Sequence, residues 1–141
     1  MPRSDRAYSK ADLHLHTSRG DGMAGPVELL EYVERETDLD LIAVTDHDQL
    51  DSALEVRELH SRRGGYSFEV ITGTEVTTIE GHLLALGIET PVPSFRPLAK
   101  TLDAVHRQGG LCLIPHPMSW LTRSIGRHGI ERVLARQADG L

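Results

Sequence analysis

The sequence predicts an α/β fold in which short buried strands alternate with amphipathic helices. Residues 41–44 and 111–114 are continuous apolar runs, which is typical of strands buried on both faces of a parallel sheet. Glycine pairs at 64–65 and 109–110 end two segments that have helical spacing of apolar residues. The expected elements are strands at 11–16, 41–44, 68–78, 82–88 and 111–114, and helices at 26–37, 50–63, 98–108 and 130–137. We therefore expect one α/β layer or barrel over residues 1–141.

The first half of the chain supplies two strand–helix units. In strand 11–16 leucine and histidine alternate, so that the leucines lie on one face of the sheet and His14 and His16 on the other. Pro26 suits the first turn of the next helix. The apolar stripe of this helix is predicted to contain Val27, Leu29, Leu30 and Val33. The strand at 41–44 and the helix at 50–63 repeat the pattern.

The second half of the chain contains a predicted hairpin. The connection at Glu80-Gly81 is short, so strands 68–78 and 82–88 are expected to run antiparallel. A proline-containing connector follows, then the helix at 98–108 and the strand at 111–114, which Pro115 ends. Residues 139–141 resemble the approach to another strand.

Composition excludes several classes of protein. The chain has 15 Lys+Arg against 21 Asp+Glu, a net charge of −6, and its cations are dispersed, which disfavours a general nucleic-acid binder. The single cysteine, Cys112, excludes an internal disulfide framework and is expected to be a buried small apolar residue. The N-terminus has no apolar stretch typical of a signal peptide, and no run approaches the roughly 20 residues that span a membrane. We expect a cytoplasmic protein without membrane association.

Side chains that can bind metal ions stand where the predicted strands end. The candidates are His14, His16, Asp21, His47, Glu75, His82 and His116. Because the carboxyl ends of parallel strands meet at one rim, these side chains are expected to converge. Imidazole and carboxylate ligands without thiolate favour Zn, Mn, Fe or Ni, and a carboxylate such as Glu75 can bridge two ions.

Each candidate also has an ordinary structural explanation. A His-x-His in a strand is more often structural than a ligand, Asp46 can begin a turn, and His116 alone suggests a core histidine. Only their joint placement at strand ends favours a metal site. His60, His106 and His128 fall on or beside helices and are expected to be solvated, whereas Trp120 is expected in the core.

These motifs resemble the PHP (polymerase and histidinol phosphatase) domain family. The matching segments, in family order, are DLHLHT at 12–17, DG at 21–22, AVTDHD at 43–48, GTEV at 73–76, GH at 81–82 and HP at 116–117. Each segment is short, but together they cover most of the chain. Within the family the sequence looks most like the small stand-alone metal-dependent phosphoesterases.

The resemblance implies a distorted (β/α)7 barrel with two or three divalent ions (Zn, Mn or Fe) at the carboxyl rim of its strands. It assigns His14, His16 and Glu75 to the first ion, Glu75, His82 and His116 to the second, and Asp21 and His47 to the third. The family pattern closes with an Asp-x-His on a late strand, and nothing after His116 supplies it. We therefore expect an incomplete barrel, in a chain truncated at its C-terminus.

The activity implied is hydrolysis of a small phosphorylated metabolite or nucleotide by attack of metal-bound hydroxide. Arg19, Arg123 and Arg127 lie near the predicted rim and are candidates for binding the substrate phosphate, because guanidinium binds phosphate through two donors. A solvated basic stretch explains the last two equally well. Asp48 and protonated His47 are the candidates for the catalytic acid. Nucleic acid is expected as a partner only in the form of a nucleotide-type substrate.

Other classes of protein remain open. An amidohydrolase-type metal hydrolase also begins with His-x-His, but its binuclear members commonly bridge their ions with a carboxylated lysine. Here Lys10 precedes the first strand and Lys100 lies on a helix. A non-catalytic structural or regulatory PHP domain would be expected to have lost ligands, and all seven positions are filled.

Overall fold

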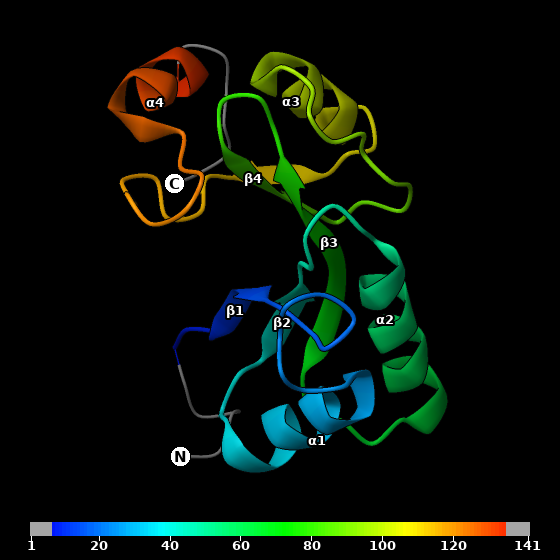
Figure 1. The fold of residues 1–141 in the computed structure, drawn as a ribbon. Coiled ribbons are helices and arrows are strands. Elements are labelled where there is room, and N and C mark those ends of the chain that lie inside the picture. The colour runs from blue at the N-terminus through cyan, green and yellow to red at the C-terminus, as the bar shows by residue number, and fades with distance from the viewer. Residues whose placement is uncertain (1–6, 135–141) are drawn as a thin grey trace.

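The computed structural model describes residues 7–134 and shows a mixed α/β fold around one curled sheet (Figure 1). The elements are β1 (Ala11–Leu15), α1 (Pro26–Glu36), β2 (Leu41–Val44), α2 (Asp51–Arg63), β3 (Glu69–Thr77), β4 (His82–Leu86), α3 (Leu98–His106), β5 (Leu111–Leu113) and α4 (Gly126–Leu134). The strand order in space, β1-β2-β3-β4-β5, is the order along the chain. The seven strands implied by the family resemblance stay a prediction, and the strand expected near 139–141 lies outside the described residues.

The long strand β3 joins two parts of the sheet. Its first half pairs in parallel with β2, from Glu69 to Thr72, and its second half pairs antiparallel with β4, from Gly73 to Thr77. A Cβ atom at Gly73 would lie 2.8 Å from the carbonyl oxygen of Ala85, so glycine permits the close approach of β4 where the pairing changes. The antiparallel hairpin was predicted correctly, and the change of partner curls the sheet into a half-barrel.

Helix α2 lies against β2 and β3 and against α1, and α3 lies against β4 and β5 (Figure 1). Leu30, Ile42, Val56 and Val76 are fully buried in the main core, which links the helices to the sheet. Cys112 is also fully buried, as predicted. Among the helices described between residues 7 and 134, none is long and apolar enough to cross a membrane.

Four local expectations are wrong. Val27 is exposed, whereas the other three members of the predicted stripe are buried and Pro26 takes its place, at i with Leu30 at i+4 and Val33 at i+7. His60 is half-buried, since its Nε2 lies 2.8 Å from the Phe68 carbonyl oxygen. Trp120 is 90% exposed and lies outside the core. Helix α4 begins at residue 126 rather than 130, and residues 135–137 of the predicted helix lie outside the described residues.

Candidate metal centre

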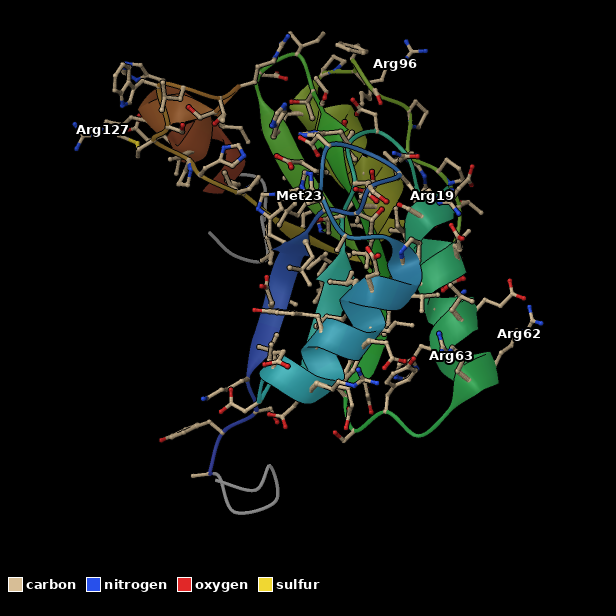
Figure 2. All side chains as sticks on the ribbon, turned by 60° about the horizontal axis from the view of Figure 1, so that its bottom comes forward. Arg19, Met23, Arg62, Arg63, Arg96 and Arg127 are labelled. Carbon is tan, nitrogen blue, oxygen red and sulfur yellow. The ribbon has the colours of Figure 1, made fainter. Side chains whose placement is uncertain are left out.

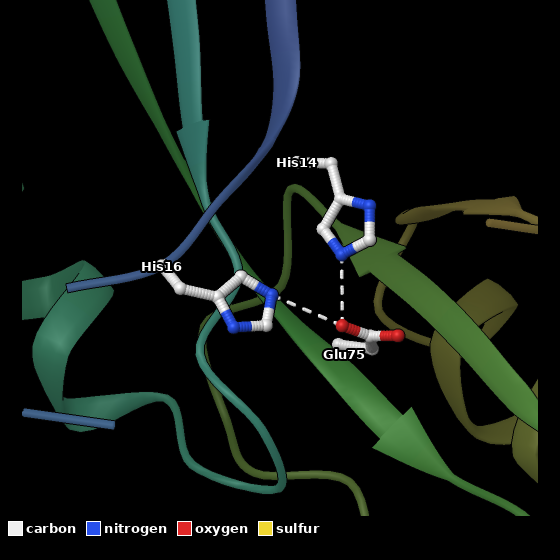
Figure 3. Close-up of side chains that lie close together, drawn as sticks. All are labelled: His14, His16 and Glu75. Carbon is white, nitrogen blue, oxygen red and sulfur yellow. Dashed lines mark hydrogen bonds and ion pairs between the residues drawn. The ribbon is translucent and has the colours of Figure 1, made fainter. Parts of the chain in front are cut away.

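Glu75, on β3, is a carboxylate that is 1% exposed and surrounded by imidazoles. Its Oε2 lies 2.8 Å from Nε2 of His14 and 3.0 Å from Nε2 of His16 (Figure 3). Its Oε1 lies 2.8 Å from Nδ1 of His82 and 2.9 Å from Nε2 of His116. Side chains from β1, β3, β4 and the loop after β5 therefore converge on one carboxyl group.

A second acidic residue extends the cluster on the side of β1. Nδ1 of His16 lies 2.5 Å from Oδ1 of Asp21, so the two ring nitrogens of His16 face two different carboxylates. Nε2 of His47 lies 3.6 Å from both Asp21 Oδ2 and Glu75 Oε2. All seven ligand residues expected from the sequence thus lie together in one cluster, which we call the His/Glu cluster.

The turn after β1 positions His16 and Asp21. Thr17 donates hydrogen bonds from its backbone N–H (2.7 Å) and its hydroxyl (2.6 Å) to the carboxylate of Asp46, and Thr17 and Asp46 are both fully buried. A Cβ atom at Gly22 would lie 2.2 Å from the carbonyl oxygen of His16, so the loop folds back tightly on the strand end. Asp46 therefore anchors this turn, which is the structural explanation that the sequence left open.

His116 is held by the loop that follows it. Its backbone φ is +32°, a sparsely populated value for a residue with a side chain. The Ser119 N–H donates to the His116 carbonyl at 3.0 Å, and Oγ1 of Thr122 lies 3.0 Å from Nδ1 of the ring. Thr122 thus orients the imidazole so that Nε2 meets Glu75. No sequence signal identified Thr122, because a threonine six residues after a histidine is an ordinary feature of a loop.

The electrostatics of the cluster keep Glu75 ionised. Burial raises the pKa of its carboxyl group, but hydrogen bonds with His14 and His116 and nearby positive charge outweigh burial and bring the pKa to about 2. The hydrogen bond with Glu75 raises the pKa of His14, against the effect of burial. Burial lowers the pKa of His82, which favours its neutral imidazole. An anionic carboxylate and a neutral imidazole are the forms that bind metal ions.

The donor set fits divalent cations. Three groups have ligand atoms within 4.8 Å of one another: His14, His16 and Glu75; His16, Asp21 and His47; and His47, Glu75 and His82. Nε2 of His16 and Nδ1 of His82 are buried and have no hydrogen-bond partner among the described residues, although both lie within 3.0 Å of Glu75. Buried polar atoms normally have partners, and a cation between these nitrogens and the carboxylate would supply one.

Asp48 is occupied by hydrogen bonds at the edge of the cluster. It accepts hydrogen bonds from the Thr77 N–H (2.7 Å), the Thr77 hydroxyl (2.7 Å) and the Ser94 hydroxyl (2.6 Å). Burial raises the pKa of Asp48, but these hydrogen bonds outweigh it and hold the pKa below its usual value. A carboxyl group held ionised in this way is poorly suited to donate a proton, so the role expected for Asp48 is not favoured. His47, the other candidate acid, lies inside the cluster.

The three arginines expected to bind phosphate do not converge. Arg19 forms a two-point ion pair with Glu55 on α2, through Nε at 2.9 Å and one terminal nitrogen at 2.7 Å. Arg123 donates to the carbonyl oxygens of Thr78 and Ile79, at 3.4 and 3.2 Å. Figure 2 shows Arg19 and Arg127 projecting at separate places on the surface. Their positions in the sequence gave no signal of these competing partners.

The known proteins similar to this chain match it over different shares of their own length. No family model matches the sequence. An uncharacterised protein of Methanocaldococcus jannaschii is 28% identical over 143 residues, which cover 94% of this chain and 79% of the relative. The 5'-3' exoribonuclease Rnm of Salmonella typhimurium is 35% identical over 98 residues, which cover 66% of this chain and 33% of the enzyme. The chain thus spans about a third of that exoribonuclease.

Solved structures share the fold at low sequence identity. A two-domain protein of Bacteroides vulgatus containing a predicted PHP-like metal-dependent phosphoesterase has a TM-score of 0.70 and 20% identity, over 91% of this chain and 42% of that one. An amidohydrolase of Chromobacterium violaceum, solved with bound sulfate and no metal, has a TM-score of 0.73 and 18% identity, over 94% and 76%. At such identities the likeness establishes a common fold.

Proposed function

We propose that this chain, which has the fold of PHP-like metal-dependent phosphoesterases, is itself a metal-dependent hydrolase of phosphoester bonds. The observation that carries the proposal is the His/Glu cluster, in which five imidazoles and Asp21 surround the buried carboxylate of Glu75. The relative named a 5'-3' exoribonuclease supports a substrate of the nucleotide type. A small phosphorylated metabolite or a nucleotide is therefore the proposed substrate.

Two or three divalent ions of the Zn, Mn or Fe type would be held by the three ligand groups of the cluster. His116 contacts Oε1 of Glu75, the same oxygen that His82 contacts, and would complete the coordination of the ion next to His82. When bound, such ions polarise phosphoryl oxygens and neutralise the charge that develops as the phosphoester bond breaks. Burial of Glu75 and the contact of Thr122 with His116 keep these ligands in place.

The loop after His116 presents apolar side chains to solvent beside the cluster. Met118, Trp120 and Leu121 are 67%, 90% and 80% exposed. Exposed large apolar side chains next to a binding site are typical of surfaces that contact a ligand. We propose that they contact the organic part of the substrate while the cluster binds its phosphate.

The proposal is tested by metal content and by phosphate release. Elemental analysis of the purified chain should find divalent metal, and added Mn or Zn should support phosphate release from an aryl phosphate and from 5'-nucleotides. His16→Ala and Glu75→Ala should abolish both properties. His128→Ala is the matched control, because this histidine side chain is 89% exposed on α4 and outside the cluster. A chain without metal, or one indifferent to the two cluster substitutions, contradicts the proposal.

An amidohydrolase remains the second candidate, because one structural neighbour carries that description. Lys10 is paired with Asp38 and Lys100 lies on α3, so neither takes part in the His/Glu cluster, and Glu75 occupies its centre. Metal-dependent cleavage of amides in preference to phosphoesters would support this candidate. Stable metal binding without turnover of either class would favour a non-catalytic structural or regulatory domain.

A further inference from the structure

A basic pocket with a volume of about 460 Å³ lies on α3, apart from the His/Glu cluster. It is formed by the connector at 92–97 and by one face of the helix. Three cations line it (Arg96, Lys100 and Arg107) together with the apolar side chains of Pro93, Pro97 and Ala104. None of these residues belongs to the metal centre or to the substrate contacts considered above.

The three cations lie close together on α3 and its connector. Lys100, Ala104 and Arg107 lie on one helical face, at i, i+4 and i+7, and Arg96 joins them from the connector. Across the part of the chain that the structure describes, these three side chains make no ion pair, and no acidic side chain lines the pocket. Like charges gathered in this way repel one another, and a bound anion relieves the repulsion. This local charge is opposite to the net charge of the chain, which is −6.

The form of the pocket adds a second requirement for the ligand. Its volume is in the range of small-molecule sites, and the two prolines and the alanine offer an apolar wall. Guanidinium groups bind phosphate through two parallel donors, and apolar walls accept a base or sugar ring. We propose that this pocket binds a nucleoside phosphate at a site separate from the metal centre. The N-terminus of α3 is not its anchor, because the Leu98 N–H already donates to the carboxylate of Glu80 at 2.8 Å.

The connector that forms one wall is fixed to the end of β3. The Phe95 N–H donates to the Thr77 carbonyl at 2.7 Å, and the Ile79 N–H donates to the Arg96 carbonyl at 3.0 Å. The Ser94 hydroxyl donates to Asp48. These bonds preform the wall, so little ordering opposes binding.

Isothermal titration of the full chain with adenosine 5'-monophosphate, after removal of metal with EDTA, tests the proposal. The nucleotide should bind, and adenosine, which lacks the anionic group, should bind at least about tenfold more weakly. Lys100→Gln with Arg107→Gln should weaken nucleotide binding by about tenfold or more and reduce its dependence on salt. Arg62→Gln with Arg63→Gln is the matched control, because it removes the same two positive charges. Both residues lie at the end of α2, away from Arg96 (Figure 2).

His16→Ala distinguishes the two sites. This substitution in the metal centre should leave nucleotide binding to the pocket unchanged. The proposal is overturned if the metal-free chain does not bind the nucleotide, or if binding is unchanged when Lys100 and Arg107 are both substituted. Binding that is lost in His16→Ala but kept in the pocket variant assigns the nucleotide to the cluster and likewise overturns it. The side chains substituted in the pocket variant and in its arginine control are exposed, so equal melting temperatures are expected for these two variants and the wild type. Since no metal is present, the outcome does not depend on whether the chain hydrolyses phosphoesters.

Discussion

Replacing Asp48 with asparagine tests whether this residue is a structural link or a proton donor. Its carboxylate joins the loop after β2 to Thr77 at the end of β3 and to Ser94 in the connector, through three hydrogen bonds of 2.6–2.7 Å. A hydrogen bond to a charged group contributes about 1.5–3 kcal/mol, against about 0.5–1.5 kcal/mol for a neutral pair. The asparagine side chain is uncharged, and its NH₂ group would face one of the three groups that donate hydrogen bonds to Asp48.

The expected loss of stability is about 1–2 kcal/mol, at or below the lower limit for a hydrogen bond to a charged group, because Asp48 is exposed and solvent weakens its interactions. For a domain of this size the melting temperature should fall by about 3–8 °C. The lowered pKa of Asp48 gives the sign of the pH dependence. The stabilisation is present above the ordinary carboxyl pKa and is lost as the pH falls through the lowered native pKa.

Urea unfolding of the metal-free chain, followed by circular dichroism at pH 7, 5 and 3, measures this difference. The difference in the free energy of unfolding between wild type and Asp48→Asn should have its whole value at pH 7 and be smaller at pH 3. Asp103→Asn, an exposed aspartate on α3, should change stability by less than about 0.5 kcal/mol. Equal stability of Asp48→Asn and wild type at pH 7, with a loss of phosphate release, would refute the structural role and restore Asp48 as a catalytic acid.

Three further predictions concern the centre and its frame. Thr122→Val removes the contact with Nδ1 of His116 and should weaken metal affinity by about tenfold in competition with a chromophoric chelator; unchanged affinity would exclude this positioning role. Trp120→Ala should change stability by less than about 0.5 kcal/mol because the ring is 90% exposed, yet raise KM for aryl phosphates more than it lowers kcat; a large loss of stability would show that the ring packs on the fold. Gly73→Ala places a Cβ atom 2.8 Å from the Ala85 carbonyl and should cost about 1–3 kcal/mol in thermal unfolding, and a neutral result would mean that β4 can move away.

Local patterns were sufficient to predict the types of the elements and the membership of the cluster. The apolar run at 41–44 is β2 with the same bounds, because four continuous apolar residues between polar ones leave little choice of register. His14 and Glu75 could be placed together because each stands near the carboxyl end of a strand, and neighbouring parallel strands bring such ends to one rim. Side-chain periodicity and strand direction can both be inferred from the order of residues in the sequence.

Partners and exposure depended on contacts between distant parts of the chain. Asp48 and Thr77 are 29 residues apart, and Arg19 and Glu55 are 36 apart, so no local pattern shows that these side chains already have partners. The exposure of Trp120 likewise depends on which elements fail to cover its loop. The sequence by itself determined which metal-binding residue types stand at the strand ends. Only the tertiary structure decided which charged groups are neutralised and which remain available, because ion pairing and burial arise from neighbours that folding brings together.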